Sequence, residues 1–386
     1  MFQKSNRLQK IPPYMFAEIS KRIQEARAKG VDVISLGIGD PDLPTPDPVV
    51  DELIKAAKNP KNHQYPDYEG MFEFRKAVSD WYKRRHNVTL DPDKEVLTLI
   101  GAKEGSVHLS LAFLNPGEYA LVPNPAYTVY KTGALMADGI PYDMPLLEEN
   151  EFLPDLLAIP SNIAKEAKLL YLNYPNNPTG AVADVDFYKE VIDFARTYNI
   201  IVVSDNPYSE IGFDGYKPLS FLEVPGAKEV GLEFNSLSKP YNMTGWRIGM
   251  AVGHPDLIKG IGDSKNNTDS GVFNAVQYAG IKALSLPDQI IENLTAIYGE
   301  RRELVCDTLT KIGLTPIKPK AAFYIWTKVP QGETSESFTT KLLEKAGVVV
   351  APGSAYGKYG EGYVRFSLTV PDHRFREAME RIKKIK

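Results

Sequence analysis

Lys239 stands in a setting that could support covalent chemistry. The segment from Asn235 to Gly249 reads NSLSKPYNMTGWRIG and brings together two serines, a lysine and an arginine without an acidic residue. Most lysines are solvated, so an ordinary surface loop is the default interpretation. A lysine amine can also react with an aldehyde, while hydroxyls and an arginine can bind a phosphate. The segment therefore suggests a site for a phosphorylated aldehyde if other motifs supply the remaining contacts.

Asp205 is the second candidate, and it follows the apolar run NIIVVS. A carboxylate at the end of a buried strand is costly unless a cation pairs with it. A protonated pyridine nitrogen could be that cation, and an acidic partner of this kind together with a Schiff-base lysine marks sites for pyridoxal 5′-phosphate (PLP). The alternative is that Asp205 caps a helix or a turn.

Two more motifs follow predicted strands. Residues 95–100 run into GAKEG, which opens a predicted helix, so that its first backbone amides would face an anion. These amides belong to Gly101, Ala102 and Lys103. Residues 168–173 run into NYPNNPTG, which is rich in asparagine and proline. Ordinary turns are the alternative interpretation of both motifs.

The elements that carry these motifs alternate between strand and helix patterns. The predicted strands are 95–100, 119–123, 168–173, 199–205, 230–236 and 247–253, with helices such as 103–114 and 184–198 between them. This alternation predicts an α/β fold with a mostly parallel central sheet covered by helices. Because ligands of such sheets bind at the carboxyl ends of the strands, we expect the motifs to share one site.

A chain of 386 residues exceeds the usual size of a single hydrophobic core, so we expect two domains. The proline-rich segment PDLPTPDP is a predicted hinge, and a long helical pattern begins near residue 286. We therefore expect residues 48–285 to form a large PLP-binding domain. Residues 1–47 and 286–386 would form a smaller α/β domain with an N-terminal arm.

Composition argues against several other classes of protein. The net charge is −4, and the 45 basic residues are scattered among 49 acidic ones, so neither nucleic acid nor a membrane surface is an expected partner. Cys306 is the single cysteine, and the five histidines lack ligand spacing, so we expect no disulfide and no metal site. The absence of a long apolar run favours a cytoplasmic protein.

Taken together, the motifs NNPTG, DNPYSE, SLSKPYNMTGWRIG and YVRFS occur in this order and mostly at strand ends. With them, the chain resembles the fold-type-I PLP-dependent aminotransferases of class I/II over essentially its full length. The beginning, RLQKIPPYMFAEI followed by VDVISLGIGDPDLPTP, is similar to the prokaryotic LL-diaminopimelate aminotransferase branch.

The resemblance implies a role for each residue of the cofactor site. Lys239 would form the Schiff base, and Asp205 would hold the pyridine nitrogen protonated. Asn177 and Tyr208 would bond to the phenolic oxygen, and Tyr127 would stack on the ring rather than serve only as a core tyrosine. The expected phosphate contacts are Gly101, Ala102, Lys103, Ser236, Ser238, Arg247 and, from the partner subunit, Tyr65.

The resemblance also implies a substrate site. Arg365 would bind the substrate α-carboxylate. Apart from the resemblance, the alternative interpretation is an arginine on an edge strand with a salt-bridge partner. The other residues expected at the substrate are Tyr14, Gly39, Lys103, Asn177 and, from the partner subunit, Asn267. A solvated first-turn residue is the alternative for Lys103.

The implied activity is transfer of an amino group from an amino acid to a 2-oxo acid by a ping-pong mechanism in a homodimer with shared active sites. The donor suggested by the branch is LL-diaminopimelate, with 2-oxoglutarate as its partner in lysine biosynthesis. Alternatives are an aspartate- or alanine-type or broad-specificity aminotransferase, a β-lyase or another PLP enzyme, a ligand-sensing domain, or a structural protein. Asn124-Pro125 and Asn177-Pro178 are expected as cis peptides.

Overall fold

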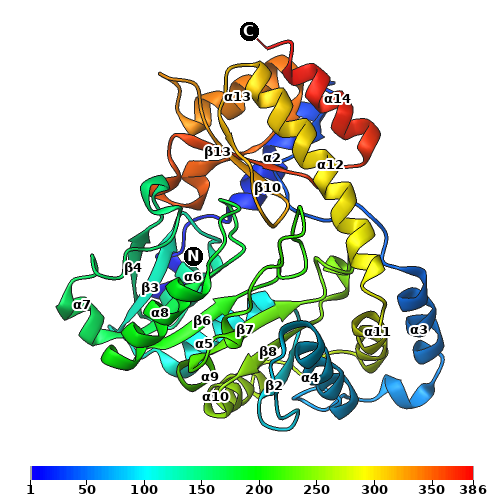
Figure 1. Cartoon of the computed structure of the whole chain (residues 1–386), viewed down its shortest axis with the longest axis vertical. Helices are drawn as coiled ribbons and strands as arrows, with labels where there is room; N and C mark the ends of the chain where they lie inside the picture. Colours follow the sequence, from blue (N-terminus) through cyan, green and yellow to red (C-terminus); the bar gives the residue numbers. More distant parts are fainter. Residues whose placement is uncertain (1, 386) are drawn as a thin grey trace.

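The computed structural model describes residues 2–385. In this part of the chain, a seven-stranded sheet is covered by helices, and a smaller group of strands and helices lies above it in Figure 1. The 23-residue helix α12 (Gln289–Lys311) runs from beside α11 up into the smaller group. The predicted α/β fold with a mostly parallel central sheet is confirmed.

The large sheet has the strand order β2-β8-β7-β6-β5-β3-β4. Its strands are β2 (Val96–Leu99), β3 (Tyr119–Asn124), β4 (Ile140–Pro145), β5 (Ala167–Leu172), β6 (Ile201–Asp205), β7 (Gly231–Ser236) and β8 (Gly249–Gly253). Among these described strands, β8 is antiparallel to both of its neighbours, and the remaining pairs are parallel. All four carboxyl ends that carry the predicted motifs therefore meet at one edge.

Three features of the predicted sheet are corrected. The strand expected from residue 199 begins at Ile201, because Asn199 caps the preceding helix with a φ of 55°. The strand expected from residue 247 begins at Gly249, because Arg247 has a φ of 56° in the left-handed region and cannot continue a strand. The strand β4 was not predicted, since its sequence IPYDMP contains two prolines. It lies at the edge of the sheet, which is where prolines are tolerated.

Side chains alternate between the two faces of the large sheet, and each face has its own core. Leu170 and Val202 belong to a cluster that includes α4 and α8, whereas their neighbours Leu169 and Val203 belong to a cluster with α5, α6 and α10. The helices around this sheet are α3 (Asp47–Ala57), α4 (Phe72–His86), α5 (Ala102–Phe113), α6 (Val129–Met136), α7 (Ser161–Glu166), α8 (Val185–Tyr198), α9 (Ala227–Val230), α10 (Pro255–Asn266) and α11 (Asn274–Leu284).

The smaller group joins the two ends of the chain. β1 (Ile34–Ser35) pairs with β11 (Val348–Val349), and the other strands form the order β12-β13-β10-β9. Its remaining elements are α2 (Met15–Ala28), β9 (Pro316–Ile317), β10 (Tyr324–Lys328), α13 (Ser335–Ala346), β12 (Ala351–Pro352), β13 (Tyr363–Ser367) and α14 (Asp372–Ile382). The short helix α1 (Asn6–Gln9) instead contacts α6 beside the large sheet. The domain boundaries, 1–47 with 286–386 and 48–285, stay a prediction.

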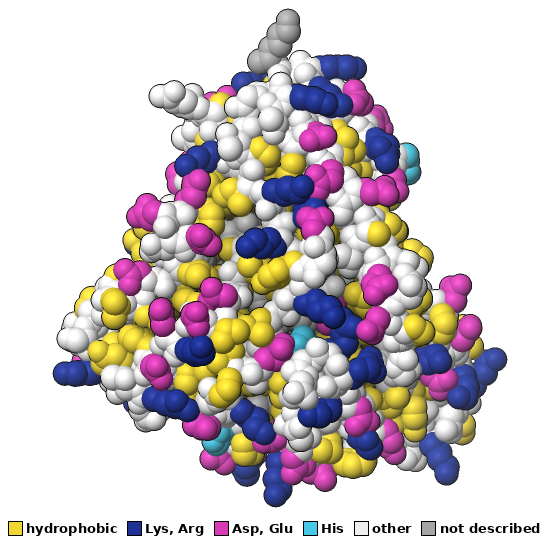
Figure 2. Space-filling model, in the orientation of Figure 1, with side chains coloured by type: hydrophobic (Ala, Val, Ile, Leu, Met, Phe, Trp, Pro, Cys, Tyr) yellow, Lys and Arg dark blue, Asp and Glu magenta, His cyan; other side chains and the backbone are white. Residues whose placement is uncertain are grey.

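Short 3₁₀ turns complete the chain: η1 (Pro60–His63), η2 (Glu148–Asn150), η3 (Phe221–Glu223), η4 (Thr244–Trp246), η5 (Gly353–Tyr356) and η6 (Lys358–Gly360). The peptides Asn124-Pro125 and Asn177-Pro178 are cis, as predicted, and Tyr174-Pro175 is cis as well. Figure 2 shows basic and acidic side chains intermixed over the face in view. Over the described residues, every helix is too short or too polar to cross a membrane.

Candidate active site

A cavity of about 340 Å³ lies where the strands β2, β5, β6 and β7 end. The smaller group closes it through the turn at Ile38–Asp40 and through Tyr324 of β10. The sequence-predicted residues that line it are Tyr14, Gly39, Ala102, Lys103, Tyr127, Asn177, Asp205, Tyr208, Ser236, Ser238, Lys239 and Arg247. Strand ends that are far apart in the sequence thus converge on one space.

Lys239 follows β7 in a turn and reaches toward the N-terminal segment. Its Nζ donates a hydrogen bond to the carbonyl of Gly39 at 2.9 Å. Burial lowers the pKa of Lys239 to about 8, and the nearby cations Arg365 and Arg247 act in the same direction, while Asp40 opposes them. A substantial fraction of the amine is therefore neutral and nucleophilic near neutral pH.

Asp205 is the last residue of β6, and its side chain is buried. The hydroxyl of Tyr130 donates a 2.6 Å hydrogen bond to Oδ2, whereas Oδ1 is buried without a hydrogen-bond partner among the described residues. Burial raises the pKa of Asp205 to about 6, and the bond from Tyr130 opposes this rise. A buried acceptor of this kind favours a cationic donor at Oδ1.

The first turn of α5 forms another side of the cavity. Gly101 caps the helix with a φ of 81°, and a β-carbon there would lie 2.3 Å from Nη2 of Arg247. Arg247 is held by the carbonyl of Thr244, which accepts a bond from Nη1 at 2.6 Å. The hydroxyl of Ser236 donates to that of Ser238 at 2.8 Å. Helix amides, hydroxyls and a guanidinium together suit a phosphate.

Arg365 lies in the interior strand β13, so the alternative of an edge-strand arginine is wrong. The side chain is fully buried, and its guanidinium stacks 4.1 Å from the ring centroid of Tyr324. Nη1 donates to Oδ1 of Asn177 at 2.7 Å, and Nη2 donates to the carbonyl of Gly37 at 2.7 Å. Arg365 is therefore held against Asn177 and Tyr324, both of which line the cavity.

Three aromatic and cationic residues form the outer wall. Nζ of Lys103 lies 4.3 Å from the ring centroid of Tyr14, so these two predicted substrate residues are in contact. Tyr127 lines the cavity beside them, and burial, together with Tyr14, raises its pKa above the ordinary value. The wall thus combines a cation with two aromatic rings.

Two predicted residues lie away from this cavity in their own chain. Tyr65 is 86% exposed. Asn267 is exposed at the end of α10, where its side-chain amide donates to the carbonyl of Asp263 at 2.8 Å. Both were expected to serve the site of a partner subunit, and these roles stay predictions.

Several residues of the site were not predicted from the sequence. Tyr130 lies three residues after Tyr127 at the start of a helix, and this spacing could have indicated that both face the same space. Asn173 directly follows β5; its side-chain amide donates to the carbonyl of Asp205 at 2.7 Å, and its Oδ1 accepts from the amide of Asn177 at 2.8 Å. Tyr324 bonds to the hydroxyl of Tyr208 at 2.8 Å, but nothing local to its segment AFYIW signals this contact.

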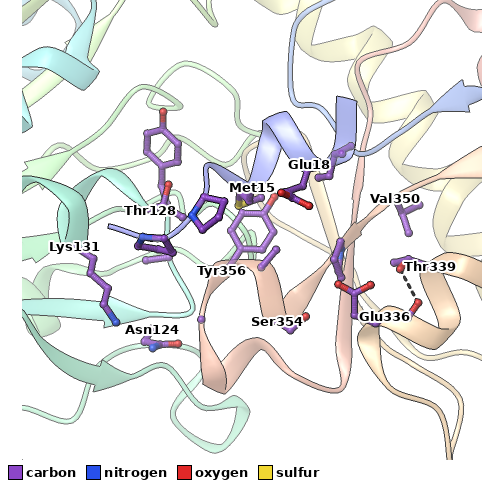
Figure 3. Close-up of a pocket in the computed structure, with 18 of the residues that line it drawn as sticks. Met15, Glu18, Asn124, Thr128, Lys131, Glu336, Thr339, Val350, Ser354 and Tyr356 are labelled. Atoms are coloured by element: carbon purple, nitrogen blue, oxygen red, sulfur yellow. Dashed lines mark hydrogen bonds between the residues drawn. The ribbon is translucent and has the colours of Figure 1, made fainter. Parts of the chain in front are cut away.

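A larger cavity of about 740 Å³ lies on the other side of the N-terminal arm (Figure 3). Tyr127 lines both cavities, whereas Tyr14 lines the smaller one and Met15 the larger one. Met15 and Tyr356 face the larger cavity in Figure 3, and Arg22 at its rim pairs with Glu336 at 2.9 Å. The start of α2 therefore separates the smaller cavity, which is the candidate active site, from the larger one.

The smaller cavity fits PLP in the chemistry of its donors. The free oxygen of Asp205 suits a protonated ring nitrogen, and Lys239 suits an aldehyde. The α5 turn with Ser236, Ser238 and Arg247 suits the phosphate. The cavity thus presents a separate partner for each of these three groups.

Comparison with known proteins agrees with this chemistry. The family model for aminotransferase class I and II matches residues 31–382. The chain is 56% identical to an LL-diaminopimelate aminotransferase of Halothermothrix orenii, over 99% of this chain and 98% of that one. It is also 56% identical to one of Aquifex aeolicus, over the whole of both chains.

A solved structure of substrate-bound BacF from Bacillus subtilis has a TM-score of 0.95 and 40% identity, and the match covers 100% of this chain and 98% of that chain. The fold and the sequence therefore point to the same group of enzymes. The chain belongs to the class I and II aminotransferases.

Proposed function

We propose that this aminotransferase uses PLP, takes its amino group from LL-diaminopimelate and passes it to 2-oxoglutarate by a ping-pong mechanism in lysine biosynthesis. Full-length similarity to LL-diaminopimelate aminotransferases supports the choice of donor. One observation carries the chemistry. Lys239, with a lowered pKa, and Asp205, with an unsatisfied carboxylate oxygen, line the same small cavity.

When bound, PLP supplies an aldehyde for amine exchange and a ring that accepts electrons released from the substrate. Lys239 would hold the aldehyde in the resting enzyme. Once the amino acid has displaced its amine, Lys239 would act as the general base that takes the proton from the substrate α-carbon. It would then act as the general acid that delivers this proton during product formation. A pKa of about 8 suits both roles, because the amine can gain and lose a proton near neutral pH.

Asp205 would keep the ring nitrogen protonated, and Tyr130 would hold the carboxylate in place through its 2.6 Å bond. Asn177 and Tyr208 would orient the ring through its phenolic oxygen. The hydroxyls of Tyr208 and Tyr324 lie 2.8 Å apart, so a proton can be shared between them near the reacting atoms. Each group is fixed by a neighbour before substrate arrives, which favours catalysis by orientation.

Arg365 would bind the α-carboxylate of every donor, because its planar guanidinium can form two parallel hydrogen bonds with a carboxylate. Tyr14, Gly39 and Lys103 would contact the remainder of the substrate. The exposure of Tyr65 and Asn267 supports a homodimer in which each chain completes the site of its partner.

A panel of donors tests the proposal. LL-diaminopimelate, aspartate, alanine, glutamate and phenylalanine would each be assayed with 2-oxoglutarate, and with pyruvate for glutamate. LL-diaminopimelate should give the highest kcat/KM, with parallel double-reciprocal lines as the ping-pong mechanism requires. Faster transfer from aspartate or alanine would replace the proposed donor, and product release without an acceptor would indicate a lyase.

A further inference from the structure

An ion cluster around the buried Lys265 adjoins the first turn of α5. Lys265 of α10 is fully buried, and its Nζ lies 2.5 Å from Oδ1 of Asp269 and 3.2 Å from Oε1 of Glu104. His108 is adjacent, with Nδ1 bonded to the hydroxyl of Ser264 at 3.0 Å. Burial of a lysine ammonium without such partners would destabilise the fold. This raises the question of what the cluster contributes to the protein.

Glu104, His108 and Asp269 have the geometry of possible metal ligands, since their ligand atoms all lie within 4.8 Å of one another. Lys265 already places its ammonium against both carboxylates. Burial lowers the pKa of His108 below its ordinary value of 6.5, although the charges of Glu104 and Asp269 oppose this and only that of Lys265 adds to it, so the histidine is mostly neutral near pH 7. The cation of this cluster is therefore the lysine.

Both carboxylates also hold backbone amides. Oε1 of Glu104, the same oxygen that Lys265 contacts, accepts from the amide of Ile100 at 2.5 Å. Oδ1 of Asp269 accepts from the amide of Gly271 at 2.8 Å. Ile100 directly precedes the turn that begins at Gly101. Glu104 thus fixes the backbone at Ile100, where the chain enters this turn.

The other side of the cluster is fixed as well. Gly271 is packed so closely that a β-carbon there would lie 3.1 Å from the carbonyl oxygen of Asp67. Lys265 also accepts the amides of Thr268 and Asp269 at its own carbonyl, which closes the loop after α10. The ammonium therefore joins Glu104 to an anchored part of the molecule.

We propose that Lys265 is a positioning residue for the cofactor phosphate: by holding Glu104 it sets the turn Ile100–Lys103 in the orientation that binds this group. The inference rests on the proposed use of PLP. Without the ammonium, two carboxylates would face each other without a cation, and Glu104 would move away from Asp269 and release the amide of Ile100. The turn would then lose its fixed orientation toward a phosphate.

The test compares the affinities of the PLP-free protein for PLP and for pyridoxal, which lacks the phosphate. Lys265→Met should weaken PLP binding roughly tenfold or more and change pyridoxal binding less than about twofold. Lys259→Met removes an exposed lysine of the same helix and should leave both affinities as in the wild type. A general loss of structure would lower both affinities together and leave their ratio unchanged.

Glu104→Gln is the second variant, because it keeps Lys265 paired with Asp269 while it removes the charge that acts on the turn. Like Lys265→Met, it should lower the ratio of PLP affinity to pyridoxal affinity, but by a smaller factor. An unchanged ratio in Lys265→Met, or in Glu104→Gln if the first variant does not fold, overturns the inference. Failure of the wild type to bind PLP would instead overturn the proposed function.

Discussion

Tyr130 donates a 2.6 Å hydrogen bond to Oδ2 of Asp205 and leaves Oδ1 without a hydrogen-bond partner within residues 2–385. Both side chains are buried, so Oδ1 is poorly solvated. A buried carboxylate with one satisfied oxygen is stable as an anion only when a cation reaches the other. This asymmetry is the structural reason to place a protonated ring nitrogen at Asp205.

Replacing Tyr130 by phenylalanine should weaken PLP binding about tenfold. A hydrogen bond to a charged group contributes roughly 1.5 to 3 kcal/mol, and its loss would raise the pKa of Asp205 further. Titration of the bound cofactor by absorbance would measure the affinity. Tyr171→Phe is the matched control, since Tyr171 stacks 5.1 Å from Tyr130 but bonds to Ser110 instead. Equal losses in the two variants would contradict a specific role of Tyr130.

The contribution of Asp205 to the stability of the PLP-free protein should fall as the pH rises from about 4 to about 6. The pKa of Asp205 is raised from 3.8 to about 6, so over this range the folded protein binds more protons than the unfolded chain. The contribution of Asp205 amounts to roughly 3 kcal/mol and should be absent from Asp205→Asn. Urea unfolding of both proteins between pH 4 and 7 measures the difference. A pH-independent difference would contradict the raised pKa.

Incorporation of PLP should depend on the neutral amine of Lys239. The pKa of about 8 predicts that the rate rises about tenfold per pH unit below pH 8 and levels off above it. Stopped-flow absorbance with the PLP-free protein measures this rate. A midpoint near 10.5, the ordinary value for lysine, would show that burial does not act on this amine.

Arg365→Ala should raise KM and lower kcat for every donor in the panel. Loss of a buried, charge-assisted contact typically costs about 2 to 5 kcal/mol, which corresponds to at least about a thirtyfold loss in kcat/KM. Arg365→Lys should recover part of this loss, because it keeps the charge but not the planar fork. Arg376→Ala, at an exposed arginine of α14, should behave as the wild type. A loss confined to one donor would place Arg365 at the distal end of the substrate.

Much of this site could be predicted because its signals are local. Asp205 ends the strand β6 and Lys239 follows the strand β7, and parallel strands bring such ends to one edge. Other features depend on packing between distant segments. The bond between Arg365 and Asn177 joins residues 188 positions apart, and the contact of Tyr208 with Tyr324 requires the smaller group to close over the sheet. No local pattern carries that information.

The cluster around Lys265 illustrates the same limit. The sequence shows a lysine four residues before Asp269, which is typical of an exposed helical ion pair. Only the packing of α10 against α5 buries the lysine of this pair and adds Glu104. A lysine that would be interpreted as solvated thus becomes part of the support for the cofactor turn.

The most direct test of the account is reduction of the purified protein, loaded with PLP, by sodium borohydride, followed by peptide mass spectrometry. The account predicts a phosphopyridoxyl group on Lys239 and loss of activity, whereas Lys239→Ala should release the cofactor as its reduced alcohol and carry no adduct at position 239. A stable adduct on another lysine, or no adduct on Lys239, would contradict it.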